Sequence, residues 1–189
     1  MIQTKLSLPQ NYDPRHAYPL ILINDGDLHH FNDFKEKAIL VGLLPENRLV
    51  DYTPWQATAI RSGAEDFGGQ ADEYHNELFY KVLPELQSKY SIDTNKIFYG
   101  GYSLGGLAAV YSLYRTNIPS AIFSIFGSFW YPEFATFCKE NTVINKNARV
   151  YLYNGKTEGS HHNNILDNAP KCAEEIHSSL HKQLNHFIS

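Results

Sequence analysis

The chain has 189 residues and a mass of 21.6 kDa, and 43% of its residues are hydrophobic. This is the size of one domain, which can bury a core without help from metals or disulfides. Lysine and arginine together number 16 against 20 acidic residues, and the net charge of -4 comes without any basic run. A nucleic-acid or anionic-membrane partner is therefore not expected. We expect one soluble domain over residues 1–189.

The cysteine content and the N-terminus both bear on the compartment. Cys138 and Cys172 form neither a C-x-x-C pair nor a dense framework, which is typical of a reducing environment. Met1–Gln10 lacks the basic start, long apolar run and small-residue cleavage site of a secretory signal. No apolar stretch is long enough to cross a bilayer. These features favour a cytoplasmic protein.

Continuous apolar runs separated by polar turns predict the strands of the first half. These strands are Lys5–Leu8, Tyr18–Ile23 and Ala38–Leu44. Such runs are typical of strands that are buried on both faces of a parallel sheet. After an irregular segment, 47–70, apolar residues recur at helical spacing from Tyr74 to Tyr90. Pro84 lies inside this pattern and is expected to kink or split the helix, because proline lacks the backbone donor.

The second half continues the alternation of strands and helices. Its expected elements are a strand Lys96–Tyr99, a helix Leu104–Arg115, strands Ala121–Phe126 and Arg149–Tyr153, and a last helix. The last helix is expected to be capped by Asn168 and to have Pro170 in its first turn. Its apolar stripe consists of Cys172, Ile176, Leu180 and Leu184. This alternation predicts an α/β fold with a mostly parallel sheet and right-handed crossovers. In such folds the functional residues gather at the carboxyl ends of the strands.

The strongest local motif is the G-x-S-x-G sequence centred on Ser103, between an expected strand and an expected helix. A sharp strand-to-helix turn forces the serine into a strained conformation, and the flanking glycines remove Cβ atoms that would collide with it. The hydroxyl of Ser103 then projects from the sheet as a nucleophile. A glycine-rich turn with an incidental serine is the alternative, which the strand before and the helix after disfavour.

Two backbone N–H groups are candidates for binding an oxyanion. Leu104 begins the helix directly after Ser103, where the N–H groups are free to bind an anion. Asp27 follows the turn Asp25-Gly26 at the end of an earlier strand, and an ordinary Asp-Gly turn is about as consistent with that local sequence. The acidic residues of this turn lack the remaining positions of a calcium loop, so no metal is expected there.

A catalytic acid is expected just beyond the strand Arg149–Tyr153. Glu158 has the position and chain order of an acid that would orient a histidine base. Asp167 is the competitor, although it lies where a helix cap is expected, and either residue could equally be a surface acid. The acid therefore remains open between these two residues, with Glu158 preferred.

Several stretches together resemble the putative esterase family of α/β-hydrolases, which includes siderophore (enterochelin-type) esterases and, more distantly, mycolyltransferases. They are LPQNYDPRHAYPLILINDGD, DYTPW, FGGQADEY, LPELQSKYSID, IFYGGYSLGGLAAVYSLY, GSFWYP and VYLYNGKTEG, in this order from about Leu8 to Gly159. The resemblance implies a three-layer α/β-hydrolase-like sandwich and a small-molecule ester substrate, without a cofactor. It also implies that Ser103 is the nucleophile, that Asp27 and Leu104 supply the oxyanion hole, that Glu158 is the acid, and that Trp130 helps to line the substrate mouth.

The family pattern also requires a histidine in a loop after one further strand. This chain ends shortly after its last expected helix, so we expect a domain that lacks the last strand and the histidine loop and is C-terminally incomplete. His186 comes last, as chain order requires, but the end of that helix lies at the opposite edge of the sheet from Ser103. The pairs His29-His30 and His161-His162 lie at the expected catalytic edge.

The sequence thus predicts a serine-dependent carboxylic-ester hydrolase that acts through an acyl-enzyme, on the condition that a histidine base is supplied. Two alternatives stay open. One is a weakly active or inactive binding protein on a hydrolase scaffold, which the absence of the expected histidine strand suggests. The other is an acyltransferase, which would share the serine, the acid and the oxyanion hole with an esterase.

Overall fold

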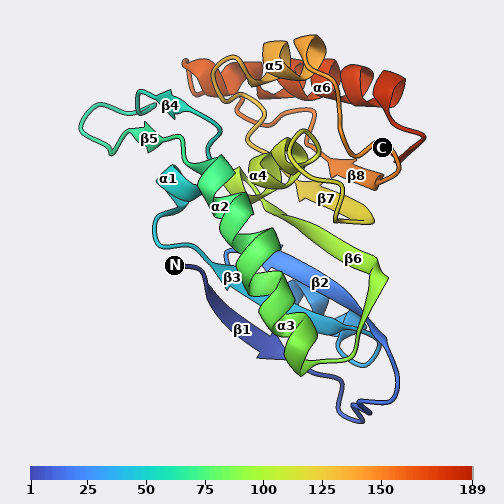
Figure 1. The fold of residues 1–189 in the computed structure, drawn as a ribbon. Coiled ribbons are helices and arrows are strands. Elements are labelled where there is room, and N and C mark those ends of the chain that lie inside the picture. The colour runs from blue at the N-terminus through green and yellow to red at the C-terminus, as the bar shows by residue number, and fades with distance from the viewer. Residues whose placement is uncertain (189) are drawn as a thin grey trace.

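The computed structural model describes residues 1–188, and within them seven strands form one sheet (Figure 1). In spatial order these strands are β1 (Gln3–Ser7), β3 (Ile39–Leu44), β2 (Tyr18–Asn24), β6 (Ile92–Tyr102), β7 (Ala121–Ile125), β8 (Arg149–Tyr153) and β9 (His186–Ile188). β1 runs antiparallel to β3, and the other neighbouring pairs are parallel. The mixed α/β fold with a mostly parallel sheet is therefore confirmed.

The apolar runs are buried on both faces of the central strands, as the sequence predicts. In β2, Leu20 and Leu22 face the main core, whereas Ile21 and Ile23 belong to a smaller cluster on the other face. β8 has the predicted bounds, but β6 is longer than expected, because the polar residues from Asp93 to Asn95 continue the strand instead of ending it.

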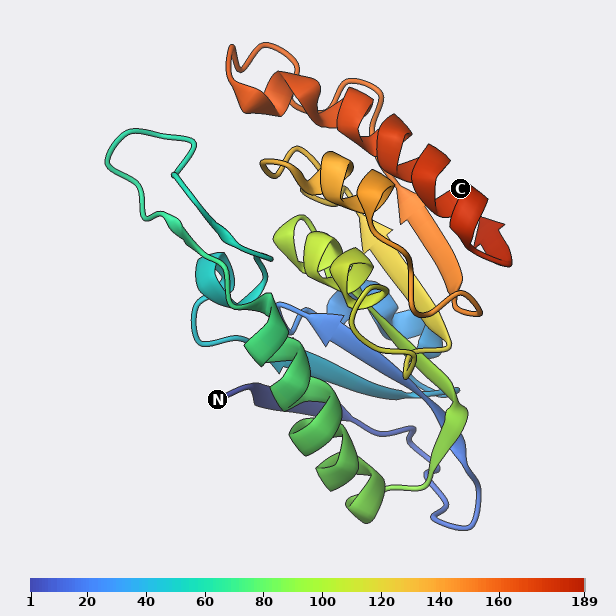
Figure 2. The ribbon, with the colours of Figure 1, turned by 45° about the horizontal axis from the view of Figure 1, so that its top comes forward.

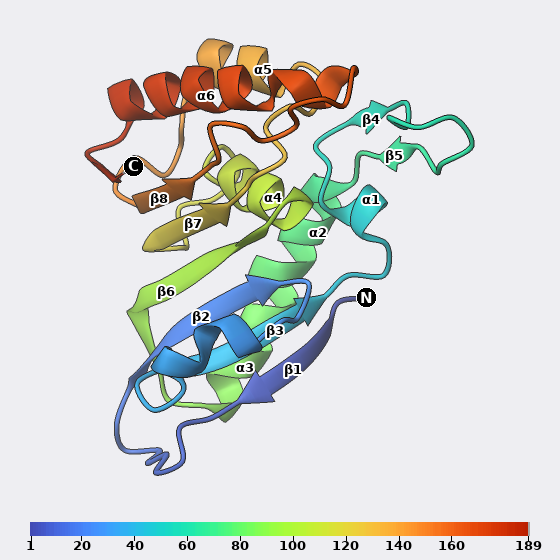
Figure 3. The ribbon, with the colours of Figure 1, turned by 180° about the vertical axis from the view of Figure 1, so that it is seen from behind.

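The main helices pack together on one face of the sheet, where they share one core with it. They are α1 (Arg48–Asp51), α2 (Ala71–Glu77), α3 (Leu83–Lys89), α4 (Leu104–Ser112), α5 (Phe134–Glu140) and α6 (Ala169–Gln183). Figure 2 shows α2–α3, α4, α5 and α6 side by side over the strands. On the other face, the short 3-10 helix η1 (His29–Phe34) lies over β2 and β3 in Figure 3. No helix within residues 1–188 combines the length and apolarity needed to span a membrane.

Contrary to the prediction, Pro84 neither kinks nor splits the long helix, but the hydrogen bonding of the helix changes just before it. The π-helical turn η2 (Leu78–Val82) joins α2 to α3, and the N–H of Leu83 donates to the carbonyl of Leu78. Pro84 then occupies the first turn of α3, where a missing N–H costs nothing. The helix therefore continues from α2 to α3 without a break or a large change in direction, as Figure 1 shows.

The C-terminal end corrects one expectation. The strand that was expected to be absent is present in part, because β9 begins at His186 and pairs in parallel with the first residues of β8. His186 lies opposite Arg149, the first residue of β8, and so it lies at the amino ends of the parallel strands. Several further elements were not predicted, among them α1, α5, the 3-10 helix η1 and a small hairpin of β4 (Gln56–Ala57) and β5 (Phe67–Gly68).

Gly100 lies on β6 where no side chain fits. An added Cβ would lie 2.2 Å from the carbonyl oxygen of Phe123 on β7. Gly100→Ala is therefore expected to lower the free energy of unfolding by about 3 kcal/mol, since backbone must move to relieve the contact. Gly155→Ala is the matched control, because its nearest contact is a ring carbon of Phe126 at 3.1 Å. Urea unfolding of both variants gives the comparison, and equal stabilities would contradict the expectation.

Candidate active site

Ser103 lies in the tight turn between β6 and α4, with φ 55° and ψ -120°. A non-glycine residue in this region typically costs about 1–3 kcal/mol, so surrounding contacts must hold it there. Its N–H donates to the carbonyl of Ile125 on β7 at 3.0 Å, and its carbonyl accepts the N–H groups of Gly106 and Leu107 at 3.0 Å. The turn is thus the strained elbow that the sequence motif predicts.

The glycines of the motif allow this turn to approach β2 closely. A Cβ on either Gly101 or Gly105 would lie 2.8 Å from the Cβ of Asn24. Leu104 is the first residue of α4, so its N–H has no helical partner four residues before it. The elbow and the end of β2 therefore form one packed unit.

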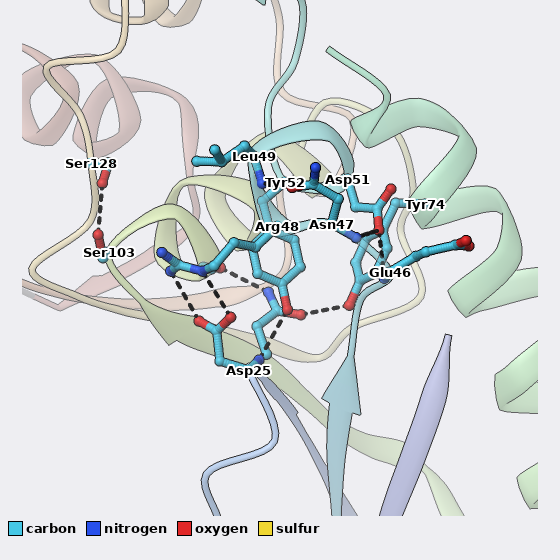
Figure 4. A network of polar contacts seen from close by, with 12 residues as sticks. Asp25, Glu46, Asn47, Arg48, Leu49, Asp51, Tyr52, Tyr74, Ser103 and Ser128 are labelled. Atoms are coloured by element: carbon cyan, nitrogen blue, oxygen red, sulfur yellow. Dashed lines mark hydrogen bonds and ion pairs between the residues drawn. The ribbon is translucent and has the colours of Figure 1, made fainter. Parts of the chain in front are cut away.

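The hydroxyl of Ser103 faces the hydroxyl of Ser128, and the two oxygens are 3.0 Å apart (Figure 4). The N–H of Ser128 also donates to the carbonyl of Ser103 at 3.1 Å. Within residues 1–188, no hydrogen bond joins Ser103 Oγ to a histidine. The partner of the candidate nucleophile in this structure is thus another serine.

The loop after β2 is held in an unusual conformation beside the elbow. Asp25 and Gly26 both have positive φ values, 66° and 70°. The carboxylate of Asp25 accepts two hydrogen bonds from Arg48, at 3.1 and 3.2 Å, and its N–H donates to the hydroxyl of Tyr52 at 2.9 Å, as Figure 4 shows. These contacts fix the turn that precedes Asp27.

Asp27 is exposed, and its side chain turns toward η1. Its Oδ1 accepts the N–H of His29 at 3.0 Å, and its Oδ2 lies 3.5 Å from Nε2 of His30. The carboxylate is therefore engaged by the residues that follow, whereas the role expected from the sequence concerns the backbone N–H of Asp27.

Asn24 joins the end of β2 to the first turn of α4. Its Nδ2 donates to the carbonyl of Gly105 at 2.8 Å and to the hydroxyl of Tyr99 at 3.0 Å, and its Oδ1 accepts from the hydroxyl of Tyr74 at 2.8 Å. Asn24 is only 2% exposed. Burial raises the pKa of Tyr74 and of Tyr99 well above the usual range, so both hydroxyls stay neutral, one donating to Asn24 and the other accepting from it.

His75 extends this buried network. Its Nε2 lies 3.2 Å from the hydroxyl of Tyr99. Burial, and then the charge of Arg115, lower the pKa of His75 to about 3. The ring is therefore neutral at physiological pH.

The lowered pKa of His75 predicts a dependence of stability on pH. The unfolded chain binds the proton with a pKa of about 6.5, so the contribution of His75 is fully present above that pH and is lost as the pH falls toward 3. The loss is about 1.4 kcal/mol per pH unit. Between pH 7 and pH 4.5 the wild type is expected to lose free energy of unfolding through His75, whereas His75→Gln has no such group to protonate. The fall in the free energy of unfolding, measured with urea, should therefore be about 2 kcal/mol smaller in His75→Gln. The exposed His16→Gln serves as control, and identical pH slopes for all three proteins would contradict the expectation.

Glu158 is half-buried in the loop after β8, and Asn154 connects it to the loop that carries Ser128. Nδ2 of Asn154 lies 3.2 Å from Oε2 of Glu158 and 3.3 Å from the carbonyl of Gly127. The competing acid, Asp167, is exposed in the 3-10 helix η3 (Ile165–Asn168). The geometry thus favours Glu158 over Asp167 as the acid nearer the elbow.

Trp130 is half-buried and contacts the hairpin that the FGG sequence forms. Its ring centroid lies 6.2 Å from that of Phe67 on β5. Trp130, which the resemblance places at the substrate mouth, therefore lies beside the strand β5.

The histidines considered as the base, which are His29, His30, His161, His162 and His186, fall into two groups. His186 lies at the amino end of β9, whereas Ser103 follows the carboxyl end of β6, so this histidine is at the far end of the sheet. The exposed pairs His29-His30 and His161-His162 follow the loops after β2 and β8, at the same edge as Ser103.

The sequence analysis missed the residues that support the elbow, namely Asn24, Arg48, Tyr74, Tyr99, Ser128 and Asn154. One signal could have found three of them, because Asn24, Ser128 and Asn154 each end or follow a strand at its carboxyl end.

Comparison with known proteins places the chain in a family. The model of the family described as "Putative esterase" matches residues 1–186. The uncharacterized protein YbbA of Bacillus subtilis is 27% identical over 190 residues, which cover 93% of this chain and 76% of YbbA.

Two solved structures share the fold. An IroE-like serine hydrolase from Shewanella oneidensis has a TM-score of 0.81 at 19% identity, covering 100% of this chain and 73% of that protein. The siderophore hydrolase EstA from Aspergillus nidulans has a TM-score of 0.70 at 15% identity, covering 98% of this chain and 80% of that protein. With its sequence matched over nearly its whole length and its fold shared with such hydrolases, the chain belongs to the putative esterase family.

Proposed function

We propose that this protein is a carboxylic-ester hydrolase in which Ser103 forms an acyl-enzyme. The observation that carries the proposal is the strained conformation of Ser103, directly before Leu104, whose N–H belongs to the first residue of α4. Family membership and the shared fold support ester hydrolysis as the reaction class. A small-molecule ester, of the kind that siderophore hydrolases suggest, is the proposed substrate.

In the proposed mechanism Ser103 Oγ attacks the acyl carbon and a tetrahedral oxyanion forms. The backbone N–H groups of Leu104 and Asp27 donate hydrogen bonds to this oxyanion, which typically contribute a factor of about 10²–10³ each. The C–O bond to the alcohol breaks, and water then hydrolyses the serine ester. Trp130, beside the β4–β5 hairpin, lines the proposed substrate mouth. The reaction needs no cofactor.

A base must take the proton of Ser103 and return it to the leaving alcohol. Glu158 is the proposed acid that orients this base, and the pairs His29-His30 and His161-His162 lie at the catalytic edge. Apo structures often hold catalytic groups too far apart for hydrogen bonds, so a loop histidine can still close on Ser103 when substrate binds. His186 is disfavoured by its position at the far end of the sheet.

The experiment is stopped-flow hydrolysis of 4-nitrophenyl acetate by the wild type and by two double variants, His29→Gln/His30→Gln and His161→Gln/His162→Gln. An acyl-enzyme predicts a burst of about one equivalent of nitrophenol, and loss of the base predicts a fall of about 10²-fold or more in one double variant. No burst and no turnover in the wild type would contradict the proposal. Added alcohols that capture the acyl group would instead indicate an acyltransferase.

The second candidate function is a binding protein without catalysis on the same scaffold. One observation favours it, because the Ser103 hydroxyl is bonded to Ser128 and not to an imidazole. This alternative predicts that an ester ligand binds in calorimetry and is recovered intact, with no burst. Turnover that requires Ser103 would eliminate it.

A further inference from the structure

We infer that Ser128 is a positioning residue for the nucleophile, which it holds in one rotamer through a hydrogen bond between the two hydroxyls. This inference rests on the proposed function, because it assigns a role in the reaction of Ser103. The two oxygens are 3.0 Å apart, and Ser128 is 1% exposed. The Ser128 hydroxyl is therefore shielded from water and directed at the reacting atom.

Ser128 is itself fixed by the backbone around it. Its N–H donates to the carbonyl of Ser103 at 3.1 Å, and its own carbonyl accepts the N–H of Tyr131 at 3.0 Å. Two residues before it, Phe126 has φ 48° and donates its N–H to the carbonyl of Tyr153 at 2.7 Å. Gly127 lies between Phe126 and Ser128, and a Cβ on this residue would lie only 2.4 Å from Ser124 Oγ. The loop thus carries Ser128 in a single, well-defined place.

The chemistry of a hydroxyl suits this place. A neutral serine is too weakly basic to act as the general base, so Ser128 does not replace the histidine that the mechanism needs. A hydroxyl can however accept one hydrogen bond and donate another as its hydrogen rotates. Before attack, the hydroxyl of Ser128 can accept a hydrogen bond from the hydroxyl of Ser103. This bond favours one of the three staggered rotamers of the Ser103 side chain. While negative charge develops on Ser103 Oγ, it can donate to that oxygen.

Both roles act on the reaction step more than on substrate binding. A hydrogen bond of ordinary strength corresponds to a change of about 3- to 10-fold in a rate. We therefore expect Ser128→Ala to lower kcat about 10-fold with little change in KM, because the lost bond concerns the nucleophile and not the substrate.

Ser124 provides a matched control. It lies on β7 four residues before Ser128, is also 1% exposed, and its hydroxyl has no hydrogen-bond partner among residues 1–188. Ser124→Ala removes the same atom from an equally buried place without touching Ser103. Any loss that is specific to Ser128→Ala therefore reports on the bond to the nucleophile.

The test measures three quantities for the wild type, Ser128→Ala, Ser128→Thr and Ser124→Ala. These are the rate of labelling by a fluorophosphonate probe, kcat and KM for 4-nitrophenyl acetate, and the melting temperature. Ser128→Ala is expected to lower the labelling rate and kcat about 10-fold at an unchanged KM and melting temperature. Ser128→Thr, which keeps a hydroxyl, is expected to recover part of the loss, and Ser124→Ala is expected to match the wild type.

Each other outcome counts against the inference. Wild-type labelling and kcat in Ser128→Ala would overturn the role of Ser128 while leaving the proposed function intact. A loss that follows the melting temperature and is not recovered by threonine would assign Ser128 a structural role only. A wild type that neither reacts with the probe nor turns over would overturn the proposed function together with the inference.

Discussion

Replacement of Ser103 by alanine is expected to lower kcat/KM for 4-nitrophenyl acetate by at least about 10³-fold, because the oxygen that forms the acyl-enzyme is lost. The oxyanion donors of Leu104 and Asp27 remain, so a small residual rate over water is expected. The structural cost should be about 1 kcal/mol, because the buried hydroxyl of Ser128 loses its partner while the backbone strain at φ 55° stays.

Ser88→Ala is a suitable control for this substitution. Ser88 lies on α3, and its hydroxyl donates to the carbonyl of Glu85 in the same helix, far along the chain from the elbow. Steady-state hydrolysis by the wild type, Ser103→Ala and Ser88→Ala gives the comparison, and the melting temperature of each protein shows that it is folded. Turnover by Ser103→Ala at the wild-type rate would remove Ser103 from the mechanism.

Asn24→Leu is expected to have the largest effect on stability among the site residues. The leucine would remove one hydrogen bond each from the carbonyl of Gly105 and the hydroxyls of Tyr74 and Tyr99. The hydroxyl of Tyr99 keeps its contact with His75, whereas that of Tyr74 loses its acceptor, and each unsatisfied buried group costs about 1–3 kcal/mol. Partial rearrangement reduces the sum, so a loss of about 3 kcal/mol in the free energy of unfolding is expected. Activity should fall too, because Asn24 connects the loop of Asp27 to the turn of Leu104.

Tyr99→Phe separates the network from simple loss of packing. It removes one acceptor of Asn24 and keeps the ring, while the bond from Asn24 to the carbonyl of Gly105 remains. Its expected cost is about 1 kcal/mol. Urea unfolding of both variants tests this order, and an Asn24→Leu protein as stable as Tyr99→Phe would contradict the role assigned to the amide.

The sequence was sufficient to predict the features that depend on a repeated apolar pattern or on a single proline or glycine. The two-sided burial of Tyr18–Ile23 follows from its unbroken apolar run. Pro84 likewise marks a change in the helix, although the result is a π-helical turn and not the predicted kink or split. The strained turn at Ser103 follows from glycines that the packing against Asn24 requires. Each of these signals is local, so it can be read without knowing which segments meet.

The supporting contacts of the site depend on segments that are distant in sequence. Tyr74 and Asn24 are 50 residues apart, and Ser103 and Ser128 are 25 apart. A single buried polar residue such as Asn24 has no period and no motif, so nothing in the chain marks its partners. The helix α5 carried a signal, because Phe134, Phe137 and Cys138 recur at helical spacing, but the segment is only seven residues long.

The expectation that the last strand is absent was wrong for a similar reason, because part of that strand is present. β9 is only three residues long, so it lacks the continuous apolar run that marks the other strands. It is recognised as a strand only from its pairing with Arg149–Tyr151 on β8 in the folded structure. The geometric argument against His186 nevertheless agrees with the structure, because α6 returns the chain to the amino ends of the strands before β9 begins.

The central claim is that Ser103 is the nucleophile, and covalent labelling tests it most directly. The protein is treated with a fluorophosphonate probe, and intact-mass and peptide mass spectrometry follow. We predict one adduct per chain, on the peptide that contains Ser103, and none in Ser103→Ala. No adduct on the folded wild type, or an adduct on another residue that persists in Ser103→Ala, would contradict the account.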